Sequence, residues 1–503
     1  MTPSLPHRGR QPKGASPLDP PGFNFFKARI RLRSTGRGSA DPERPWLHPY
    51  LTLSHTGFLQ SQKTSDLRHE KNSAGFLACK RITPGFIIIT SHYSLTMSQD
   101  PAVKGVRPVA SRTLMYYLSL IGFFAIFSTT ISKNPVLPLF VTAMGAGDSV
   151  LGLIAAISPL AGILFSFPVG VLSDRIGRRR LLLASGCVFL LAPLLYLFIS
   201  DPLWLVPVRF FHGTATAILG PVVSAIIAER FPETKGEMLG TYSSATLIGR
   251  TIAPLAGGII ITAFAFTPGL FPYRMVYIAA ALAAVPVFIL ILRYREAPAG
   301  SSGLPGISVF YESLATFAGN RRLRATALAD MATYFAFGAF ETFLPVYLFA
   351  LRFEAYQIGI IFAVQVLIIA VTKPFFGRAA DRIDKRIQII AGLLVTGGAI
   401  AAIPFAATYP GFLAASTVFG LGISLSTVAT SAYVADVAKT EEIGASMGAL
   451  SSIMDIGHAA GPLVTGVVIT FAGYSSGFTA GFVLAAAVAG IFALSVRNRD
   501  ITR

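Results

Sequence analysis

Charged residues are scarce in this chain. They make up 13% of its 503 residues, whereas hydrophobic residues make up 53%. A soluble protein of this size carries about a quarter of charged residues. An aqueous fold with so few charges would need an improbably large dry core, so the composition predicts a membrane protein.

Cysteine is nearly absent, and so are the patterns that usually mark catalysis. The only two cysteines, Cys79 and Cys187, lie far apart, which argues against a disulfide framework. No Gly-rich loop ends in Lys-Ser/Thr, and no His/Cys/Asp/Glu cluster has the spacing of metal ligands. We therefore expect no enzyme, no cofactor, no metal site and no ATP-driven pump.

Positive charge is concentrated at the N-terminus. The net charge is +18, and residues 1–96 hold 14 Lys/Arg against 5 Asp/Glu. This segment is rich in Pro, Gly, Ser and Arg. Its one strongly apolar stretch, residues 86–90, is far too short to cross a bilayer. We predict that residues 1–96 form a disordered basic extension.

Three explanations for this extension remain open. It is a targeting peptide, a basic arm for anionic lipid or nucleic acid, or sequence upstream of a true start at Met97. We favour the start at Met97, because the composition changes abruptly there and residues 97–112 form a short basic cytoplasmic lead. We expect no nucleic-acid partner, since nothing in the segment resembles a folded binding module.

Long apolar stretches dominate the rest of the chain. A membrane-spanning helix needs about 20 mostly apolar residues. Twelve such stretches follow, at residues 113–142, 150–171, 180–199, 203–228, 239–264, 274–292, 325–350, 356–377, 387–407, 409–434, 443–471 and 475–496. We predict an all-α membrane protein with two six-helix bundles, 113–293 and 325–497. A cytoplasmic linker, 294–324, joins them, and a short tail, 498–503, ends the chain.

The basic residues in the loops predict the orientation. With the N-terminus in the cytoplasm, the inner loops and C-terminal tail after the first span hold nineteen Lys/Arg. The outer loops hold two, Arg274 and Arg352. Cations are enriched on the cytoplasmic side of membrane proteins. We therefore expect a multi-pass protein of the inner or plasma membrane with both termini in the cytoplasm.

The two halves repeat one another. A shift of 207 residues superimposes several motif residues: Gly152 on Gly359, Gly170 on Gly377, Asp174 on Asp381, Arg175 on Arg382 and Gly213 on Gly420. A shift of 208 places Gly240, Gly249, Pro254 and Gly258 on Gly448, Gly457, Pro462 and Gly466. This register predicts two halves of the same topology, related by an axis along the membrane normal, as in many secondary transporters.

Three motifs carry a family resemblance. They are "GVLSDRIGRRR" at 170–180, "RFFHGTATA" at 209–217 and "GTYSSATLIGRTIAPLAGG" at 240–258. With them, residues 113–496 resemble the major facilitator superfamily. The third motif resembles the span-five motif of drug exporters that exchange substrate for protons, although Ala253 stands where the family has glycine. The resemblance implies transport by alternating access and, from the third motif, antiport.

The resemblance also implies roles for two motifs. The gating-loop residues are Gly170, Asp174, Arg175, Gly177 and Arg178, with Gly377, Asp381 and Arg382 in the second half. Asp174 would help to hold one face closed, and Arg178 with Glu229 could complete that cluster. The alternative is that the arginines only set topology. The span-five residues are Gly240, Gly249, Pro254, Gly257 and Gly258, and helix packing explains most of their pattern.

Ionisable residues within spans are costly and usually face a partner or a wet cavity. We expect Lys133 and Asp330, near span ends, to snorkel. The others are not repeated: Arg209 aligns with Ser416, Arg250 with His458 and Glu341 with Asn134. A charge needed only to build a half should recur. We therefore assign Arg209, Glu341, Asn134, Arg250 and Asp455 to proton coupling and the substrate cavity.

Within that set we expect more specific roles. Glu341 is the protonatable carboxylate, Arg209 serves proton coupling, and Asp455 pairs with Arg250 across the two halves. His458 is a satisfied packing histidine rather than a proton shuttle. Few charges on the cavity faces disfavour highly charged substrates.

Together these features predict a monomeric secondary transporter in the bilayer that exports a small organic molecule, such as a drug or metabolite, with protons as the coupling ion. The first alternative is proton-coupled uptake of a sugar, carboxylate or other nutrient. A non-transporting membrane sensor belongs to a different class, and a membrane-embedded enzyme has the least support.

Overall fold

The protein is described by a computed structural model that covers residues 78–81, 87–90, 112–294, 315, 317–438 and 443–496. The chain divides into two compact units, Met1–Val106 and Arg107–Arg503. In the first unit, β1 (Ala78–Arg81) pairs antiparallel with β2 (Ile87–Thr90). These eight residues depart from the predicted disorder, because the β-branched run in β2 favours a strand. The other residues of the extension lie outside the described ranges.

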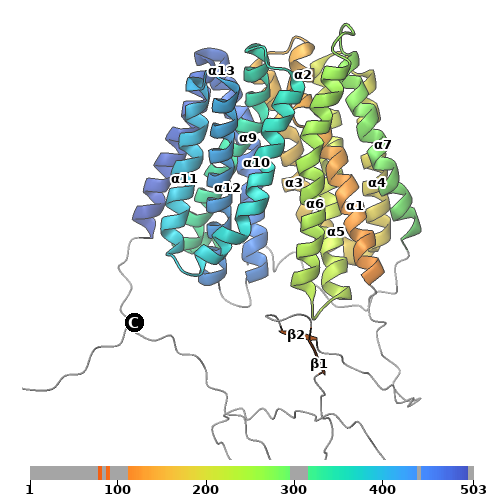
Figure 1. The fold of residues 1–503 in the computed structure, drawn as a ribbon, viewed down its shortest axis with the longest axis vertical. Helices are drawn as coiled ribbons and strands as arrows, with labels where there is room; N and C mark the ends of the chain where they lie inside the picture. Colours follow the sequence, from red (N-terminus) through yellow and green to blue (C-terminus); the bar gives the residue numbers. More distant parts are fainter. Residues whose placement is uncertain are drawn as a thin grey trace, which may run out of the picture. The chain divides into compact units, whose positions relative to one another are not determined.

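The first half of the second unit supplies six spans (Figure 1). Span one is broken into α1 and α2 by residues 132–135. The elements are α1 (Arg112–Ile131), α2 (Val136–Ala143), α3 (Asp148–Ile176), α4 (Arg178–Leu195), η1 (Tyr196–Phe198), η2 (Pro202–Trp204), α5 (Leu205–Arg230), α6 (Lys235–Ala263) and α7 (Phe271–Arg293).

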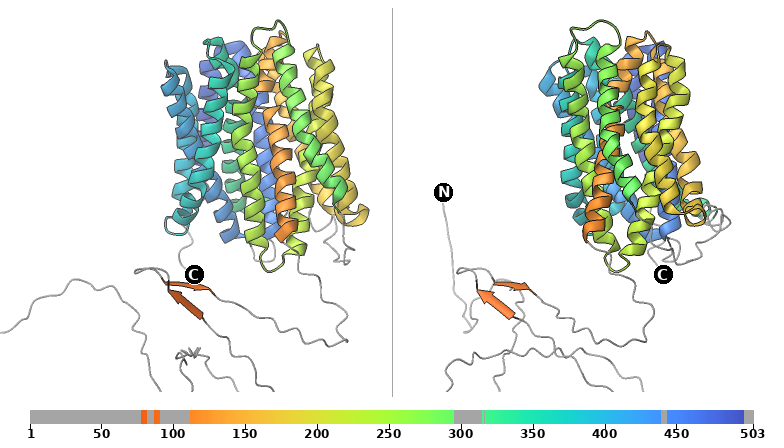
Figure 2. Two further views of the ribbon diagram at one scale, coloured as in Figure 1. Left: turned by 45° about the vertical axis from the view of Figure 1, so that its right-hand side comes forward. Right: turned by 90° about the vertical axis from the view of Figure 1, so that its right-hand side faces the viewer.

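The second half has the same order of spans. Its elements are α9 (Arg321–Ala350), α10 (Ala355–Ala380), α11 (Lys385–Ala402), η3 (Ile403–Phe405), α12 (Tyr409–Val437) and α13 (Ile443–Ser495). Eleven helices among the described residues are long and apolar enough to cross a membrane. The last, α13, contains two spans that meet at Gly473, where φ is +80°. The predicted all-α fold of two six-helix bundles is confirmed, and the helices run side by side in every view (Figure 2).

Glycine contacts within each half follow the predicted repeat. A Cβ on Gly213 would come within 2.8 Å of the Ser158 carbonyl oxygen, and one on Gly420 within 3.0 Å of the Gln365 oxygen. Ser158 and Gln365 are 207 residues apart, as Gly213 and Gly420 are. Gly249 meets the Phe123 carbonyl in the same way that Gly457 meets that of Met331. Each half is therefore packed by the same close helix contacts.

The contacts between the halves are also two-fold symmetric. A Cβ on Gly152 would lie 2.3 Å from the Pro462 carbonyl oxygen, and one on Gly359 would lie 2.5 Å from the Pro254 oxygen. A second related pair joins Gly466 to the Asp148 carbonyl and Gly258 to the Ala355 carbonyl, at 2.6 and 2.3 Å. All four contacts lie at one end of the bundle, near the starts of α3 and α10, the end of α6 and the Gly473 break in α13. The register predicted from sequence thus identifies real partners.

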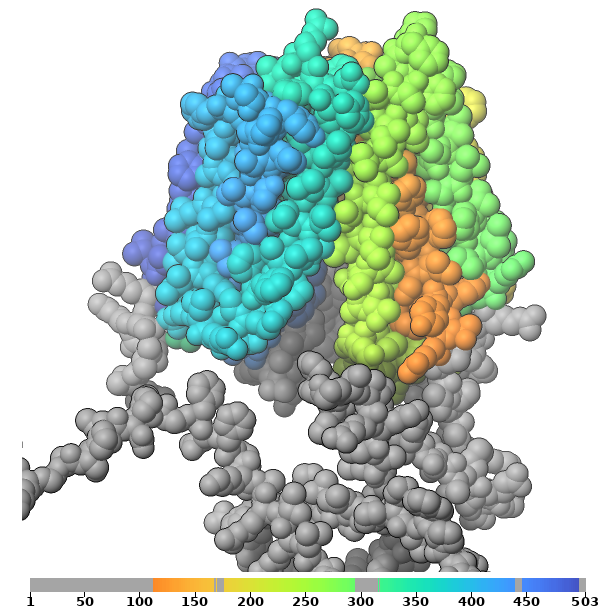
Figure 3. Space-filling model, in the orientation of Figure 1, coloured from red at the N-terminus to blue at the C-terminus, as the bar shows by residue number. Residues whose placement is uncertain are grey.

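The opposite end of the same helices is open. Nothing lies within 4 Å of a Cβ built on Gly240 or Gly448, near the starts of α6 and α13. Most of residues 232–244 and 371–378 are exposed. In Figure 3, α6 and α10 touch in the upper part of the molecule and separate towards the bottom. The two halves therefore close the end predicted to face outward and open the end predicted to face the cytoplasm.

Gly152→Ala tests the closed end. Its methyl group would meet a backbone carbonyl that cannot move alone, so we expect destabilisation of about 1–3 kcal/mol. Thermal unfolding of the purified protein in detergent measures this loss, and Gly359→Ala should match it by symmetry. Gly240→Ala, which has open space, is the control and should be neutral or slightly stabilising. Equal effects in all three variants would contradict the close packing.

Candidate functional site

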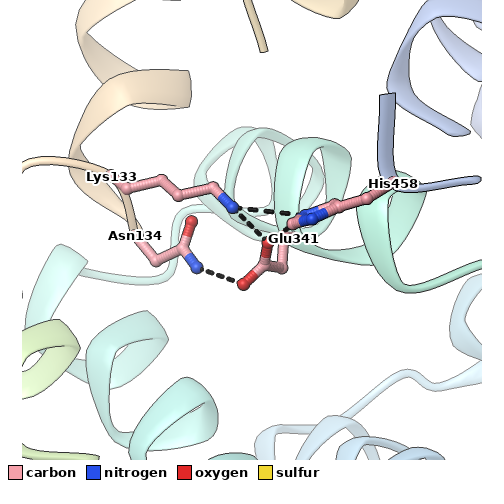
Figure 4. Close-up of polar contacts among 4 residues, drawn as sticks. All are labelled: Lys133, Asn134, Glu341 and His458. Carbon is pink, nitrogen blue, oxygen red and sulfur yellow. Dashed lines mark hydrogen bonds and ion pairs between the residues drawn. The ribbon is translucent and has the colours of Figure 1, made fainter. Parts of the chain in front are cut away.

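A cluster of four polar side chains joins the two halves near the closed end; we call it the Glu341 cluster (Figure 4). Glu341 projects from α9 towards the break between α1 and α2. Its Oε2 lies 2.6 Å from Lys133 Nζ and 3.0 Å from His458 Nε2, and its Oε1 accepts a hydrogen bond from Asn134 Nδ2 at 2.7 Å. Lys133 Nζ is also 3.3 Å from His458 Nε2.

The expected role of Lys133 is wrong: it does not snorkel, because its ammonium is held by Glu341. His458 has a hydrogen-bond partner, as expected of a satisfied histidine, and that partner is the same carboxylate oxygen. One sequence signal could have found Lys133. Asn134 and Glu341 occupy equivalent positions of the repeat, and the residue next to Asn134 must also lie near the axis between the halves.

The Glu341 cluster is mostly buried but retains some contact with solvent. The side chains of Lys133, Glu341 and His458 are 26%, 11% and 19% exposed. A carboxylate with so little contact with solvent depends on its ion pair and hydrogen bonds, and removal of one partner leaves an uncompensated charge. Since Lys133 and Asn134 belong to one half and Glu341 and His458 to the other, any movement that separates the halves here must first replace these bonds.

Asp330 forms a second buried polar contact. It is 4% exposed, and its Oδ1 accepts a hydrogen bond of 2.8 Å from Thr430 Oγ1 on α12. The expectation that it snorkels is wrong. Helix α9 begins at Arg321, so Asp330 lies more than two turns inside the helix on a face packed against α12.

Arg209 lies in α5 and is 3% exposed. Its Nε and Nη2 have no hydrogen-bond partner among the described residues. It lies close enough to Lys133, Tyr196 and His212 to act on them electrostatically. Tyr196 in turn stacks on Tyr277, with ring centroids 4.3 Å apart. The arrangement is a buried cation in an aromatic setting, in the same half of the molecule as Lys133.

The expected ion pair between Arg250 and Asp455 is not formed. No contact joins them among the hydrogen bonds and ion pairs of the described residues. Asp455 instead packs against α3, where a Cβ on Gly162 would lie 3.2 Å from its Oδ2. Arg250 is exposed. Sequence position places both residues at mid-depth but cannot tell which neighbouring helix each one faces.

The loop motif shows a symmetric pair of ion pairs. Arg178 binds Glu229, as expected, and Gly177 makes the turn before α4 with φ +93°. At the equivalent positions, 207 residues later, Lys385 Nζ lies 2.8 Å from Asp436 Oδ2. The side chains of residues 170–175, including Asp174 and Arg175, lie outside the described part of the structure. Gly377, Asp381 and Arg382 lie at the C-terminal end of α10, where Asp381 and Arg382 are exposed.

Two arginines of the loops also cap helices. Arg179 Nε donates to the Tyr294 carbonyl at 2.9 Å, beyond the end of α7, and Arg386 Nη1 donates to the Val496 carbonyl at 3.2 Å, beyond the end of α13. Cations at a helix C-terminus satisfy free carbonyls and oppose the helix dipole. These arginines therefore do more than set topology, because each ties the third span of its half to the sixth.

Four of the five span-five residues are packing residues in this structure. Gly257 lies against α1 and α2, with the Ile131 carbonyl oxygen 3.2 Å from an added Cβ, and Gly258 lies against α10. Gly249 and Pro254 make the symmetric contacts described above, and Gly240 is free of neighbours. Among the described residues, no group of three His, Cys, Asp or Glu is placed to hold a metal ion.

Lys373 is not among the site residues predicted from the sequence. It lies in α10, seven residues before the helix ends, and its side chain is exposed. It lies close enough to Arg250 and Asp330 to act on both electrostatically. From sequence, a cation this close to the end of a span is easily assigned to the loop that follows it. Only the helix face on which it lies shows whether it belongs to that loop or lines the space between the halves.

Comparisons with known proteins agree with this architecture. An uncharacterized MFS-type transporter of Methanocaldococcus jannaschii is 24% identical over 344 residues, which cover 68% of this chain and 88% of that protein. The multi-drug resistance efflux pump PmrA of Streptococcus pneumoniae is 30% identical over 152 residues, 29% of this chain and 38% of the pump. The structure of the nucleoside transporter NupG superimposes with a TM-score of 0.67 at 12% identity, covering 77% of this chain and 100% of NupG.

A family model covers nearly all of the helical unit. The model described as Major Facilitator Superfamily matches residues 118–364 and 326–502. These two matches include all the spans of both halves and the Glu341 cluster. The chain is therefore a multi-pass membrane transporter that belongs to the major facilitator superfamily.

Proposed function

We propose that the protein exports a small organic molecule in exchange for protons, and that the Glu341 cluster couples the two movements. The observation that carries this proposal is the ion pair between Lys133 and Glu341, which joins the halves while their outer ends are closed. In this scheme both termini lie in the cytoplasm and the open end faces inward.

The coupling follows from the charge of one carboxylate. Ionised Glu341 binds Lys133, Asn134 and His458 at once. A proton on Glu341 removes its negative charge, which weakens the ion pair and leaves the outer ends held mainly by the glycine contacts. Protonated Glu341 therefore belongs to the state whose outer side is open, where it takes up its proton from outside. After the outer side closes, loss of the proton through the inner end restores the pair, so each export cycle moves protons inward and substrate outward.

Neighbouring charges bias the same equilibrium. Arg250 acts electrostatically on His458 and Lys133, and Asp455 interacts with Lys133. Buried Arg209 adds positive charge on the side of Lys133. The loop residues Asp174 and Arg178 would stabilise closure of the inner end. The similarity to a named multi-drug efflux pump favours export over uptake.

Flux measurements test the proposal. In proteoliposomes with an imposed pH gradient and a panel of compounds, we expect Glu341→Gln and Arg209→Ala to reduce gradient-driven flux to the level seen without a gradient. Asp436→Asn is the matched control, because it removes a carboxylate from an exposed ion pair and should keep coupling. Full coupling in both test variants would remove these assignments. Absence of flux for every compound in the unmodified protein would favour the sensor.

The strength of the joining ion pair is a separate prediction. In a double-mutant cycle of Lys133→Met and Glu341→Gln, scored by thermal unfolding, we expect a coupling energy of about 1–3 kcal/mol. The exposed pair Lys385–Asp436 serves as the reference and should give about 0.2–1 kcal/mol. A smaller value for Lys133 and Glu341 than for the reference pair would show that the cluster does not hold the halves together.

A further inference from the structure

We propose that the opening between α6 and α10 binds an anionic group of the transported solute, such as a carboxylate, sulfonate or phosphate, through Arg250 and Lys373. This inference names the substrate class and rests on the transport proposed above. It adds a cation, Lys373, to the few cavity charges from which we expected highly charged substrates to be disfavoured.

The face of α6 that carries Arg250 is turned away from lipid. The exposed isoleucines Ile248, Ile252 and Ile259 form one apolar stripe on this helix. With about 100° between successive residues, Arg250 lies roughly 200° from Ile248, on the opposite side. It is nevertheless exposed. A side chain that is exposed on the non-lipid face of a spanning helix must face the opening between the halves.

Lys373 has the same placement on α10. The exposed apolar stripe of that helix contains Leu367, Val371 and Phe375. Lys373 lies about 200° from the middle of this stripe, and it is also exposed. The two cations thus line the opening from opposite halves of the molecule, close enough to interact electrostatically.

Neither cation is neutralised by a direct contact. No hydrogen bond or ion pair of the Arg250 or Lys373 side chain occurs among the described residues. The nearby acids are otherwise engaged: Glu341 binds Lys133, Asp330 is buried against Thr430, and Asp455 packs against Gly162. Two like charges in a space bounded by protein repel each other, and an anion placed between them relieves that repulsion.

The geometry also explains how such a site would open and close. Arg250 and Lys373 belong to different halves, so an anion that binds both pulls α6 and α10 together on the side that is open here. The guanidinium suits bidentate binding of carboxylate or phosphate oxygens, while the ammonium acts as a point charge. Binding of the solute would therefore favour closure of the inner end.

A thiol on the same face of α6 as Arg250 reports the local charge. Ser243 is exposed and lies seven residues before Arg250, on the same face of α6. The probe is Ser243→Cys in the full chain lacking its own cysteines (Cys79→Ser, Cys187→Ser). We measure its modification by anionic methanethiosulfonate ethylsulfonate and by cationic methanethiosulfonate ethyltrimethylammonium, each relative to its rate with a small free thiol.

The expected result is that the anionic reagent reacts about tenfold faster than the cationic one. Arg250→Gln and Lys373→Gln should each lower this preference. Arg352→Gln, which removes an exposed cation from an outer turn, is the control and should not. Two independent variants, each checked by size-exclusion chromatography, keep the test valid if one fails to fold. No preference, or a preference for the cationic reagent, would overturn the anion site.

The flux assay separates this inference from the proposed function. If the compounds driven by the pH gradient carry an acidic group and lose flux in Arg250→Gln and Lys373→Gln, the inference holds. If only cationic or neutral compounds are moved, and their coupling still depends on Glu341, the anion site is wrong and the proposed function stands. If acidic compounds move without any dependence on Glu341, the proposed coupling is wrong and the anion site stands.

Discussion

The architecture depends on one physical constraint, the distance at which two helix backbones can approach inside a bilayer. Lipid tails are as apolar as leucine, so burial of apolar side chains does little to bring helices together. Glycine allows a carbonyl oxygen of one half to lie where a side chain of the other would stand, as at Gly152 with Pro462 and Gly258 with Ala355. These glycine contacts between the halves occur at one end of the molecule only. The helices of the two halves can therefore separate at the other end.

Much of this fold could be predicted from the sequence because the two halves are repeats. The shift of 207 to 208 residues places Gly152 on Gly359 and Pro462 near Pro254, and the structure uses these as two related contacts. Span number and length follow from apolar runs of bilayer length. The break between α1 and α2 was missed, although polar residues and Pro135 interrupt the apolar run at 132–135 and an interior proline removes a helix hydrogen bond.

The candidate site was less predictable for a physical reason. A charge within a span must find a partner, but sequence does not say in which direction its helix face points. Glu341 was identified because it lacks a repeated counterpart, whereas Lys133 was assigned to the span end, although its long side chain reaches Glu341. Lys373 was overlooked beside a basic loop. Helix faces, fixed only by packing, distinguish a cation that sets topology from one that lines an opening.

The contact between Asn134 and Glu341 has a consequence for how such a molecule becomes directional. These residues occupy the same position of the duplicated unit and touch one another, so they sit where the unit meets its own copy. In an ancestor with identical halves, the same residue type would have stood on both sides of this contact. Two glutamates there would repel each other, and two asparagines would carry no charge. Divergence at this single point gives one half an acid and the other a neutral donor. That difference is the smallest change that allows a symmetric pair of bundles to respond to protonation.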